Sequence, residues 1–193
     1  MSEQIVTDDA AEVEVFYEKA LGDNQEGLMG KSLTAPYKPG ARIGHAVKLK
    51  PEDNDFDLVI TGAEWGTGKR AGWLTSFDIS CRTTSGVDGR ESVVGDGLLQ
   101  IGKVSTGLKE KPEEGLSFKE MTDMLEKIVV RTEGRKIKVK PEIVVTVQYQ
   151  NIQKSPTYSS GYALRFPRIT RLREDRGVDD IATLEEVEGG SGE

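Results

Sequence analysis

The stretch of sequence that decides the fold reads IQKSPTYSSGYALRFPRITRLREDR and occupies residues 152–176. It opens with a Ser, Pro, Tyr and Gly cluster typical of a turn, and residues 162–170 then have the pattern of a β-strand. Arginine carries a planar, permanently charged fork that binds phosphate oxygens in pairs, so the stretch indicates phosphate chemistry or nucleic-acid binding. A strand whose solvated face happens to be basic is the alternative. The last twelve residues contain five arginines, Arg165, Arg168, Arg171, Arg173 and Arg176.

Upstream of this stretch, strands are predicted at regular spacing from Phe56 onward. Residues 117–130 predict one amphipathic helix, because Ser117 and Glu120 match a capping box and an apolar stripe follows. Five strands with a helix between the third and the fourth is the order of an OB-fold, a small barrel that commonly binds oligonucleotides. The predicted fold class is therefore mainly β with minor α. The first four strands are expected at 58–63, 73–82, 98–107 and 136–153, the last of them broken at Pro141.

The first fifty residues predict one helix and two short strands. The helix is expected to start at Thr7 or Asp8 and to end near Leu21, and the strands lie within 26–33 and 45–51. These three elements cannot enclose a core alone. They either pack on the residues that follow or form the end of a larger domain.

Two lysines alternate along the second of these strands. Lys48 and Lys50 are two residues apart, so both ammonium groups point to one face, where they suit a polyphosphate. A solvated edge strand that lysines protect against aggregation is the alternative. His45, the one histidine, is interpreted as a surface residue.

Charge is distributed unevenly along the chain. The net charge is -7, yet residues 131–176 contain eleven Lys and Arg against four Asp and Glu. Phosphate affinity depends on the local patch, so the acidic total does not exclude a nucleic-acid partner. A single cysteine, Cys81, excludes an internal disulfide and is expected to be a core residue in a reducing compartment. With no membrane-length apolar run and no signal peptide, we expect a soluble intracellular protein.

The loop GTGKRAG at residues 66–72 is basic and rich in glycine. It lacks the spacing of a P-loop and joins two predicted strands rather than a strand and a helix. Lys69 and Arg70 in this loop could contact a DNA backbone, or the loop could simply be a turn. The two interpretations have equal weight.

Several motifs in fixed order resemble the ATP-dependent DNA ligases of the archaeal and eukaryotic nuclear type. EG-x-M-x-K, APY-x-PG-x-R and K-x-K-P near the start resemble motifs IV and V, although Ala46 and Val47 stand where the family usually has Trp-Leu. GKVSTGL, VKPEIVV, LRFPR and R-x-RED-[KR] follow, and the last string resembles motif VI. LRFPR favours the DNA ligases over RNA ligases and capping enzymes. The resemblance runs from about Val13 to Glu188.

The resemblance implies roles for individual residues. Glu26 would help to hold Mg²⁺, and the motif VI residues would orient the pyrophosphate that leaves ATP. Arg176 stands where the family commonly has lysine, which preserves the charge but changes its geometry. The nucleotide-contacting residues would be Lys31, Arg42, Lys48 and Lys50, and the motif VI residues would be Arg171, Arg173, Asp175 and Arg176. The candidate DNA contacts come from the basic loop and the basic stretch themselves, and they are Lys69, Arg70, Arg165 and Arg168.

The nucleophilic lysine that ligases carry in K-x-D-G-x-R has no counterpart in this sequence. Aligning Asp88 and Gly89 with that motif puts Gly86 at the lysine and Glu91 at the arginine. We therefore expect the C-terminal part of a ligase. Residues 1–52 would end an adenylation domain, 53–176 would form an OB domain, and 177–193 would be an acidic, flexible tail.

The implied cofactors are ATP and Mg²⁺, and the implied partner is nicked duplex DNA in replication, repair and recombination. N-terminal adenylation and DNA-binding domains would complete the enzyme, and a sliding clamp is a further partner that the resemblance leaves open. No membrane is expected, and the location would be the cytoplasm, or the nucleus in a eukaryote. The rival interpretation is a non-catalytic OB module that binds single strands or acts as a scaffold. Such modules rely on aromatic platforms, and aromatic residues are only 6% of this chain.

Overall fold

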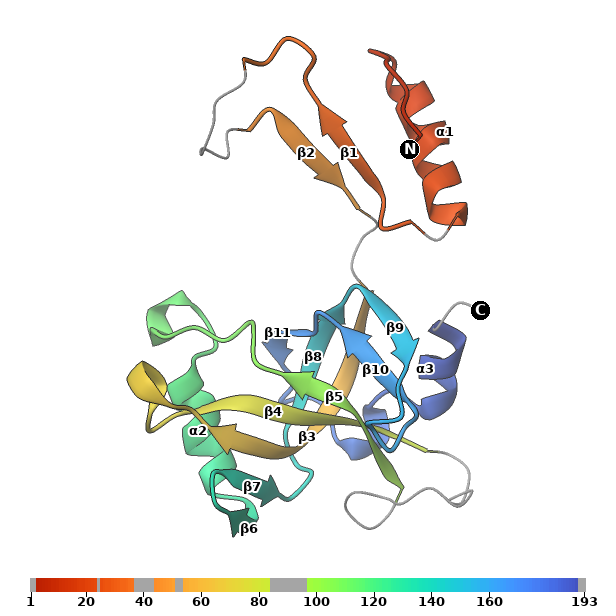
Figure 1. The fold of residues 1–193 in the computed structure, drawn as a ribbon. Helices are drawn as coiled ribbons and strands as arrows, with labels where there is room; N and C mark the ends of the chain where they lie inside the picture. The colour runs from red at the N-terminus through yellow and green to blue at the C-terminus, as the bar shows by residue number, and fades with distance from the viewer. Residues whose placement is uncertain (1–2, 24, 37–43, 51–53, 84–96, 191–193) are drawn as a thin grey trace. The chain divides into compact units, whose positions relative to one another are not determined.

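The computed structural model divides the chain into two compact units, Met1–Glu52 and Asp53–Glu193 (Figure 1). The chain is mainly β, with three α-helices among the described residues. None of these helices combines the length and the apolar character that crossing a bilayer requires. The residues described are 3–23, 25–36, 44–50, 54–83 and 97–190.

The first unit consists of helix α1 (Ala10–Gly22) and a ribbon of two antiparallel strands, β1 (Leu28–Lys31) and β2 (Ala46–Leu49). Asp9 is the N-cap, because its carboxylate accepts the N–H of Ala11 at 2.8 Å. The helix thus starts slightly later than the sequence predicted. No residue of α1 is fully buried, and the residues of its apolar stripe are half-buried, so the unit covers this stripe only in part.

The second unit is built on a curled antiparallel sheet in which the strands follow the order β11–β8–β3–β4–β5. The core lies on its concave side and includes the fully buried Leu58, Phe77 and Ile101. Cys81 is also buried there, as expected. The strands of this path are β3 (Asn54–Trp65), β4 (Leu74–Arg82), β5 (Leu98–Val104), β8 (Val144–Tyr149) and β11 (Arg168–Leu172).

Two long strands bend and so curl the sheet. β8 is followed after Gln150 by β9 (Asn151–Lys154), and β10 (Tyr162–Arg165) is followed by β11 after a break at Phe166 and Pro167. Phe166 has a φ of 51°, an uncommon conformation for a bulky residue, and it marks that corner. Beyond the corner β9 and β10 pair with each other, and the N–H of Ser160 reaches the carbonyl of Gln100 on β5. The result is a half-barrel that agrees with the predicted OB-fold.

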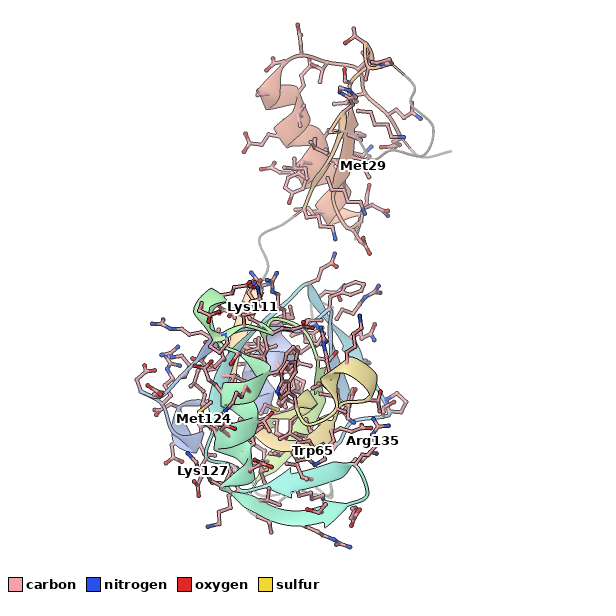
Figure 2. The ribbon with its side chains drawn as sticks, turned by 90° about the vertical axis from the view of Figure 1, so that its left-hand side faces the viewer. Met29, Trp65, Lys111, Met124, Lys127 and Arg135 are labelled. Carbon is pink, nitrogen blue, oxygen red and sulfur yellow. The ribbon has the colours of Figure 1, made fainter. Side chains whose placement is uncertain are left out.

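The predicted helix between the third and fourth barrel strands is α2 (Phe118–Glu126). Its capping box is present: the N–H of Ser117 donates to Glu120 at 2.9 Å, and the N–H of Glu120 donates to Ser117 at 3.2 Å. The helix ends earlier than predicted, because the β-branched Val129 and Val130 begin strand β6 (Val129–Glu133). β6 forms a hairpin with β7 (Lys136–Val139), which also pairs with β3. Arg135 in the hairpin turn donates to the carbonyl of Trp65 at 3.2 Å (Figure 2).

The C-terminal residues differ from the expected flexible tail. They form a short helix η3 (Val178–Asp180) and helix α3 (Leu184–Gly190), which lies beside β9 (Figure 1). Ile181 packs with Val59, Leu98 and Val144 in a second, smaller apolar cluster, and Val187 is fully buried. The acidic composition suggested a solvated tail, but apolar residues at regular intervals give this segment a buried side. We call residues 177–190 the C-terminal segment.

Candidate functional sites

The β1–β2 ribbon brings three candidate lysines to one face. Lys48 pairs directly with Met29, and Lys31 pairs with Ala46 (Figure 2 labels Met29). Directly paired residues share a face, as do residues two apart in a strand, so Lys31 and Lys48 project from the same side. Lys50 continues the alternation just beyond β2. All three lysines are exposed, so this lysine face (Lys31, Lys48, Lys50) is open to an anion.

Gly27 stands between Glu26 and the ribbon, where no other residue fits. Its φ is 119°, and a Cβ built on it would lie 2.1 Å from the carbonyl oxygen of Leu49. Both the left-handed backbone and this close approach require glycine. The glycine thereby holds the exposed Glu26 next to the end of β2, from which Lys48 and Lys50 extend.

A Mg²⁺ site at the lysine face would need carboxylate ligands from nearby residues. The described residues contain no group of three or more His, Cys, Asp or Glu side chains that could hold a metal ion. Mg²⁺ commonly uses one or two carboxylates together with substrate phosphates and water. Glu26, which is exposed just before the ribbon, suits the role of one such ligand and not that of a member of an all-protein cage. Arg42, and the residues around Asp88 that resemble the nucleophile motif, lie outside the described residues.

The motif VI residues form a compact ionic cluster after β11. The Nε and Nη2 atoms of Arg173 donate to the two oxygens of Asp175, at 2.9 and 2.8 Å. Its Nη1 atom donates to Asp57 at 2.8 Å, and Nη1 of Arg176 lies 2.7 Å from the same oxygen of Asp57. Two of the four predicted motif VI residues, Arg173 and Arg176, therefore meet at one carboxylate that the sequence had not singled out, and a third, Asp175, is bonded to Arg173.

Asp57 is held firmly within β3. Its side chain is only 9% exposed, the hydroxyl of Thr146 donates to its other oxygen, and its backbone carbonyl accepts the N–H of Ala182. The sequence showed Asp57 between Phe56 and Leu58, which identifies an outward-facing position in a strand. No local pattern connects it with Arg173, which is 116 residues further along the chain.

The hydrogen bonds within the cluster fix its charges. Those from Arg173 hold the pKa of the Asp175 carboxyl far below its ordinary range. The same bonds, together with the nearby charge of Asp57, raise the pKa of Arg173. Arg173 and Asp175 are therefore both ionised across the physiological pH range.

An open cleft of about 1000 Å³ lies in front of the cluster, between the outer face of the barrel and the C-terminal segment. Arg171 lines the cleft, is exposed, and has no carboxylate partner among the described residues. Arg82 lies opposite, and its Nε atom donates to the carbonyl of Ile181 at 3.3 Å. Arg171 is thus the motif VI arginine that is most available to a phosphate group.

The candidate DNA-contacting residues differ in how far they are engaged. Arg70, in the short helix η1 (Gly68–Arg70), donates to Glu110 at 2.9 Å and lies over the ring of Phe118 at 4.9 Å. It therefore fastens the loop to the body of the unit. Lys69 is exposed beside it. Arg168 is exposed on β11, and Arg165 lies over the ring of Phe166 at 5.1 Å, so these two flank the corner of the bent strand.

Two family descriptions match the chain. "ATP dependent DNA ligase C terminal region" matches residues 70–176, more than half of the sequence, and "ATP dependent DNA ligase domain" matches residues 1–50. The chain belongs to the ATP-dependent DNA ligase family. It includes the OB-fold C-terminal region, and ATP is the cofactor that this membership implies.

Relatives among the archaeal DNA ligases are similar over nearly the whole chain. The DNA ligase of Nanoarchaeum equitans is 46% identical over 185 residues, which are 95% of this chain and 31% of the relative. The DNA ligase of Archaeoglobus fulgidus is 43% identical over 188 residues, which are 97% of this chain and 31% of the relative. The chain thus spans about a third of the length of these relatives.

Solved ligase structures share the fold at low sequence identity. A structure from a study of Lig E DNA ligases matches with a TM-score of 0.54 and 20% identity, over 89% of this chain and 49% of the other. The ligase domain of LigD from M. tuberculosis matches with a TM-score of 0.51 and 22% identity, over 86% and 50%. The matched ligase C-terminal region ends at Arg176, so the C-terminal segment that lines the cleft lies beyond it.

Proposed function

We propose that this chain acts in ATP-dependent sealing of nicked duplex DNA, where it supplies the lysines that contact the nucleotide and the OB domain that contacts DNA. The observation that carries the proposal is the shared face of Lys31, Lys48 and Lys50 in a member of this family. Each step of nucleotidyl transfer develops charge on phosphate oxygens, and clustered cations stabilise that charge.

At the lysine face, Lys31, Lys48 and Lys50 bind the phosphates of ATP, together with Arg42. Three ammonium groups on one exposed face repel one another in water, and a polyphosphate relieves that repulsion. Glu26 contributes one ligand to Mg²⁺, which when bound neutralises part of the phosphate charge. Gly27 keeps Glu26 at the end of the ribbon.

In the OB domain, Lys69, Arg165 and Arg168 contact the DNA backbone, and Arg70 supports the loop that carries Lys69. Motif VI (Arg171, Arg173, Asp175, Arg176) orients the pyrophosphate as it leaves ATP. The exposed large apolar residues include only one aromatic ring, Phe166, among the described residues. A stacking platform for single strands needs more than one ring, so duplex binding is favoured.

As the sequence suggested, the division lies between residues 52 and 53, but the proposed OB domain extends beyond Arg176, where the sequence predicted a separate tail. Residues 1–52 end the nucleotidyltransferase domain, and the OB domain begins at residue 53 and includes the packed C-terminal segment. Adenylation and DNA-binding domains complete the enzyme, and a sliding clamp is a further partner. Because the relatives are archaeal DNA ligases, we place the protein in the cytoplasm, in replication and repair.

A sealing assay in two parts tests this function. The chain is mixed with the remaining domains of the Nanoarchaeum equitans ligase, without the region that matches this chain, and joining of nicked duplex is measured. We expect sealing that depends on ATP and Mg²⁺, and we expect Lys48→Ala to reduce it at least about a hundredfold, since the lysine stabilises charge at the reacting phosphates.

Lys111→Ala is the matched control, since Lys111 is exposed on the second unit, outside the lysine face (Figure 2). It should leave sealing unchanged. Absence of sealing together with preferential binding of single strands would replace the proposal with a non-catalytic OB module. Equal losses for Lys48→Ala and Lys111→Ala would remove the lysine face from the nucleotide site.

A further inference from the structure

The ionic cluster around motif VI includes a carboxylate that does not belong to the motif. Asp57 lies on β3, outside motif VI, yet a single oxygen of its carboxylate accepts a hydrogen bond from Arg173 and forms an ion pair with Arg176. Its other oxygen is occupied by the hydroxyl of Thr146. A nearly buried carboxylate with both oxygens engaged is a strong and fixed counter-ion.

Arg173 offers little free surface to a phosphate in this arrangement, because its side chain is only 16% exposed. Its Nε, Nη1 and Nη2 atoms all donate to carboxylates, two to Asp175 and one to Asp57. Arg176 is less restricted, because its side chain is 40% exposed. Two of the five N–H groups of Arg173 remain, one on Nη1 and one on Nη2, so a phosphate competes with these carboxylates for Arg173.

The two carboxylates differ in which of them can move with the arginine. Asp175 is two residues from Arg173, so the pair can move as one unit. Asp57 is fixed, because it pairs with Thr146 where β3 meets β8, and because the backbone carbonyl of Asp57 accepts the N–H of Ala182. The bond that a phosphate can replace when motif VI moves is therefore the bond to Asp57.

We propose that Asp57 is a positioning residue for motif VI, which holds Arg173 and Arg176 at the cleft and competes with phosphate groups for them. The inference rests on the proposed function and adds to it a resident competitor that is not part of the motif. Phosphate entering the cleft meets Arg171 first, then displaces Asp57 from Arg176 and from the Nη1 atom of Arg173, while Asp175 stays with its arginine. Without the Asp57 carboxylate, a phosphate could bind both arginines without first displacing an ion pair.

The test measures binding of inorganic tripolyphosphate to the 193-residue chain by calorimetry, without any other domain. Asp57→Asn removes the competing charge but keeps an acceptor for Thr146, and we expect roughly tenfold tighter binding. Asp55→Asn is the matched control: it makes the same charge change two residues away on β3, at a residue that also lines the cleft but has no ion pair among the described residues, so it measures the effect of charge without a competing contact. It should change the affinity less than about twofold.

The direction of the effect separates positioning from support of the fold. Damage to the fold weakens binding, whereas removal of a competitor tightens it. Asp57→Glu should restore the wild-type affinity, and Arg176→Ala added to Asp57→Asn should remove most of the gain. Unchanged or weaker binding by Asp57→Asn would overturn the proposal.

A second measurement uses the unaltered protein and so does not depend on how a variant folds. Nitrogen-detected NMR of the guanidinium groups should show the Arg173 and Arg176 signals shifting as tripolyphosphate is added. Shifts confined to Arg171 would overturn the proposal, because they would show that Asp57 keeps both arginines.

Nicked duplex in place of tripolyphosphate identifies the source of the phosphate. Tightening by Asp57→Asn that is confined to tripolyphosphate assigns the exchanged phosphates to the nucleotide, and tightening confined to duplex assigns them to DNA. Because neither measurement requires sealing, failure of this inference is distinguishable from failure of the proposed function.

Discussion

At the scale of single residues, the cluster around Arg173 is controlled by competition rather than by titration. The pKa of Asp175 is held far below its ordinary range and that of Arg173 is raised, both through their mutual hydrogen bonds. Their charges therefore do not change between about pH 5 and pH 9. Only another anion can take the place of a carboxylate in the cluster, which suits a site that responds to phosphate.

Gly27 is the residue whose replacement most directly tests the lysine face. In Gly27→Ala, the new methyl group would lie 2.1 Å from the carbonyl oxygen of Leu49, on a backbone with a φ of 119°. Strain of this kind costs about 2 kcal/mol or more, and the short ribbon can avoid it only by separating its strands. We expect faster amide hydrogen exchange throughout β1 and β2, and loss of sealing in the two-part assay.

Gly22→Ala is the control, because a Cβ at Gly22 meets no atom within 4 Å. It should leave both measurements unchanged. Normal exchange in β1 and β2 of Gly27→Ala would contradict the close approach on which the placement of Glu26 depends.

The two candidate sites show which residues sequence alone could place. The shared face of Lys48 and Lys50 follows from their spacing, since strand side chains alternate. Lys31 lies on the same face only because the register of the ribbon pairs Met29 with Lys48, and the sequence does not specify that register. Asp57 could not be identified at all, because its arginine partners come from the opposite end of the OB domain. Local periodicity predicts which face of a strand a residue occupies, but only the pairing of distant segments shows which residue it contacts.

At the scale of elements, α2 and α3 both begin with a capping box, but only the first was predicted as a helix from the sequence. Ser117 and Glu120 predicted α2 correctly, because a capping box is a local interaction. Thr183 and Glu186 form the same reciprocal bonds at the start of α3, at 2.7 and 3.2 Å. The acidic composition after Asp179 instead suggested a solvated tail, so composition over a window is a poor guide to a short packed helix.

Val187 tests whether the C-terminal segment is an integral part of the OB domain. The side chain is fully buried and belongs to the main core cluster. Val187→Ala should lower the free energy of unfolding of the second unit by about 2 kcal/mol, through lost burial and the cavity that remains. Urea denaturation followed by tryptophan fluorescence measures this, since Trp65 and Trp73 both pack against that core.

Gly189→Ala in the same helix is the matched control, because a Cβ there meets no atom within 4 Å. It should be neutral or slightly stabilising. A flexible tail would instead give no measurable change for either variant, so an effect of Val187→Ala below about 0.3 kcal/mol would contradict the packed segment.

At the scale of the whole molecule, a chain with a net charge of -7 can bind DNA only through local arrangement of its cations. Carboxylates engage several arginines of the second unit: Arg70 with Glu110, Arg135 with Glu64, and Arg173 with Asp57 and Asp175. An arginine that already neutralises a carboxylate releases fewer counterions from DNA than one facing solvent. The DNA contacts should therefore come from the cations that no acidic side chain engages.

Arg168 and Arg70 provide a direct test of this selection. Arg168 is exposed and has no acidic partner among the described residues, whereas Arg70 is bonded to Glu110 and covers Phe118. Arg168→Ala should weaken binding to nicked duplex equally across sequences and reduce the slope of log K against log salt by about 1. Arg70→Ala should leave the slope nearly unchanged and cost up to about 1 kcal/mol of stability, from an exposed ion pair and a cation–π contact. Fluorescence anisotropy of a labelled nicked duplex over a salt series measures both variants. If Arg70→Ala reduced the slope as much as Arg168→Ala, ion pairing would not decide which cations reach the DNA, and Arg70 would itself be a DNA contact.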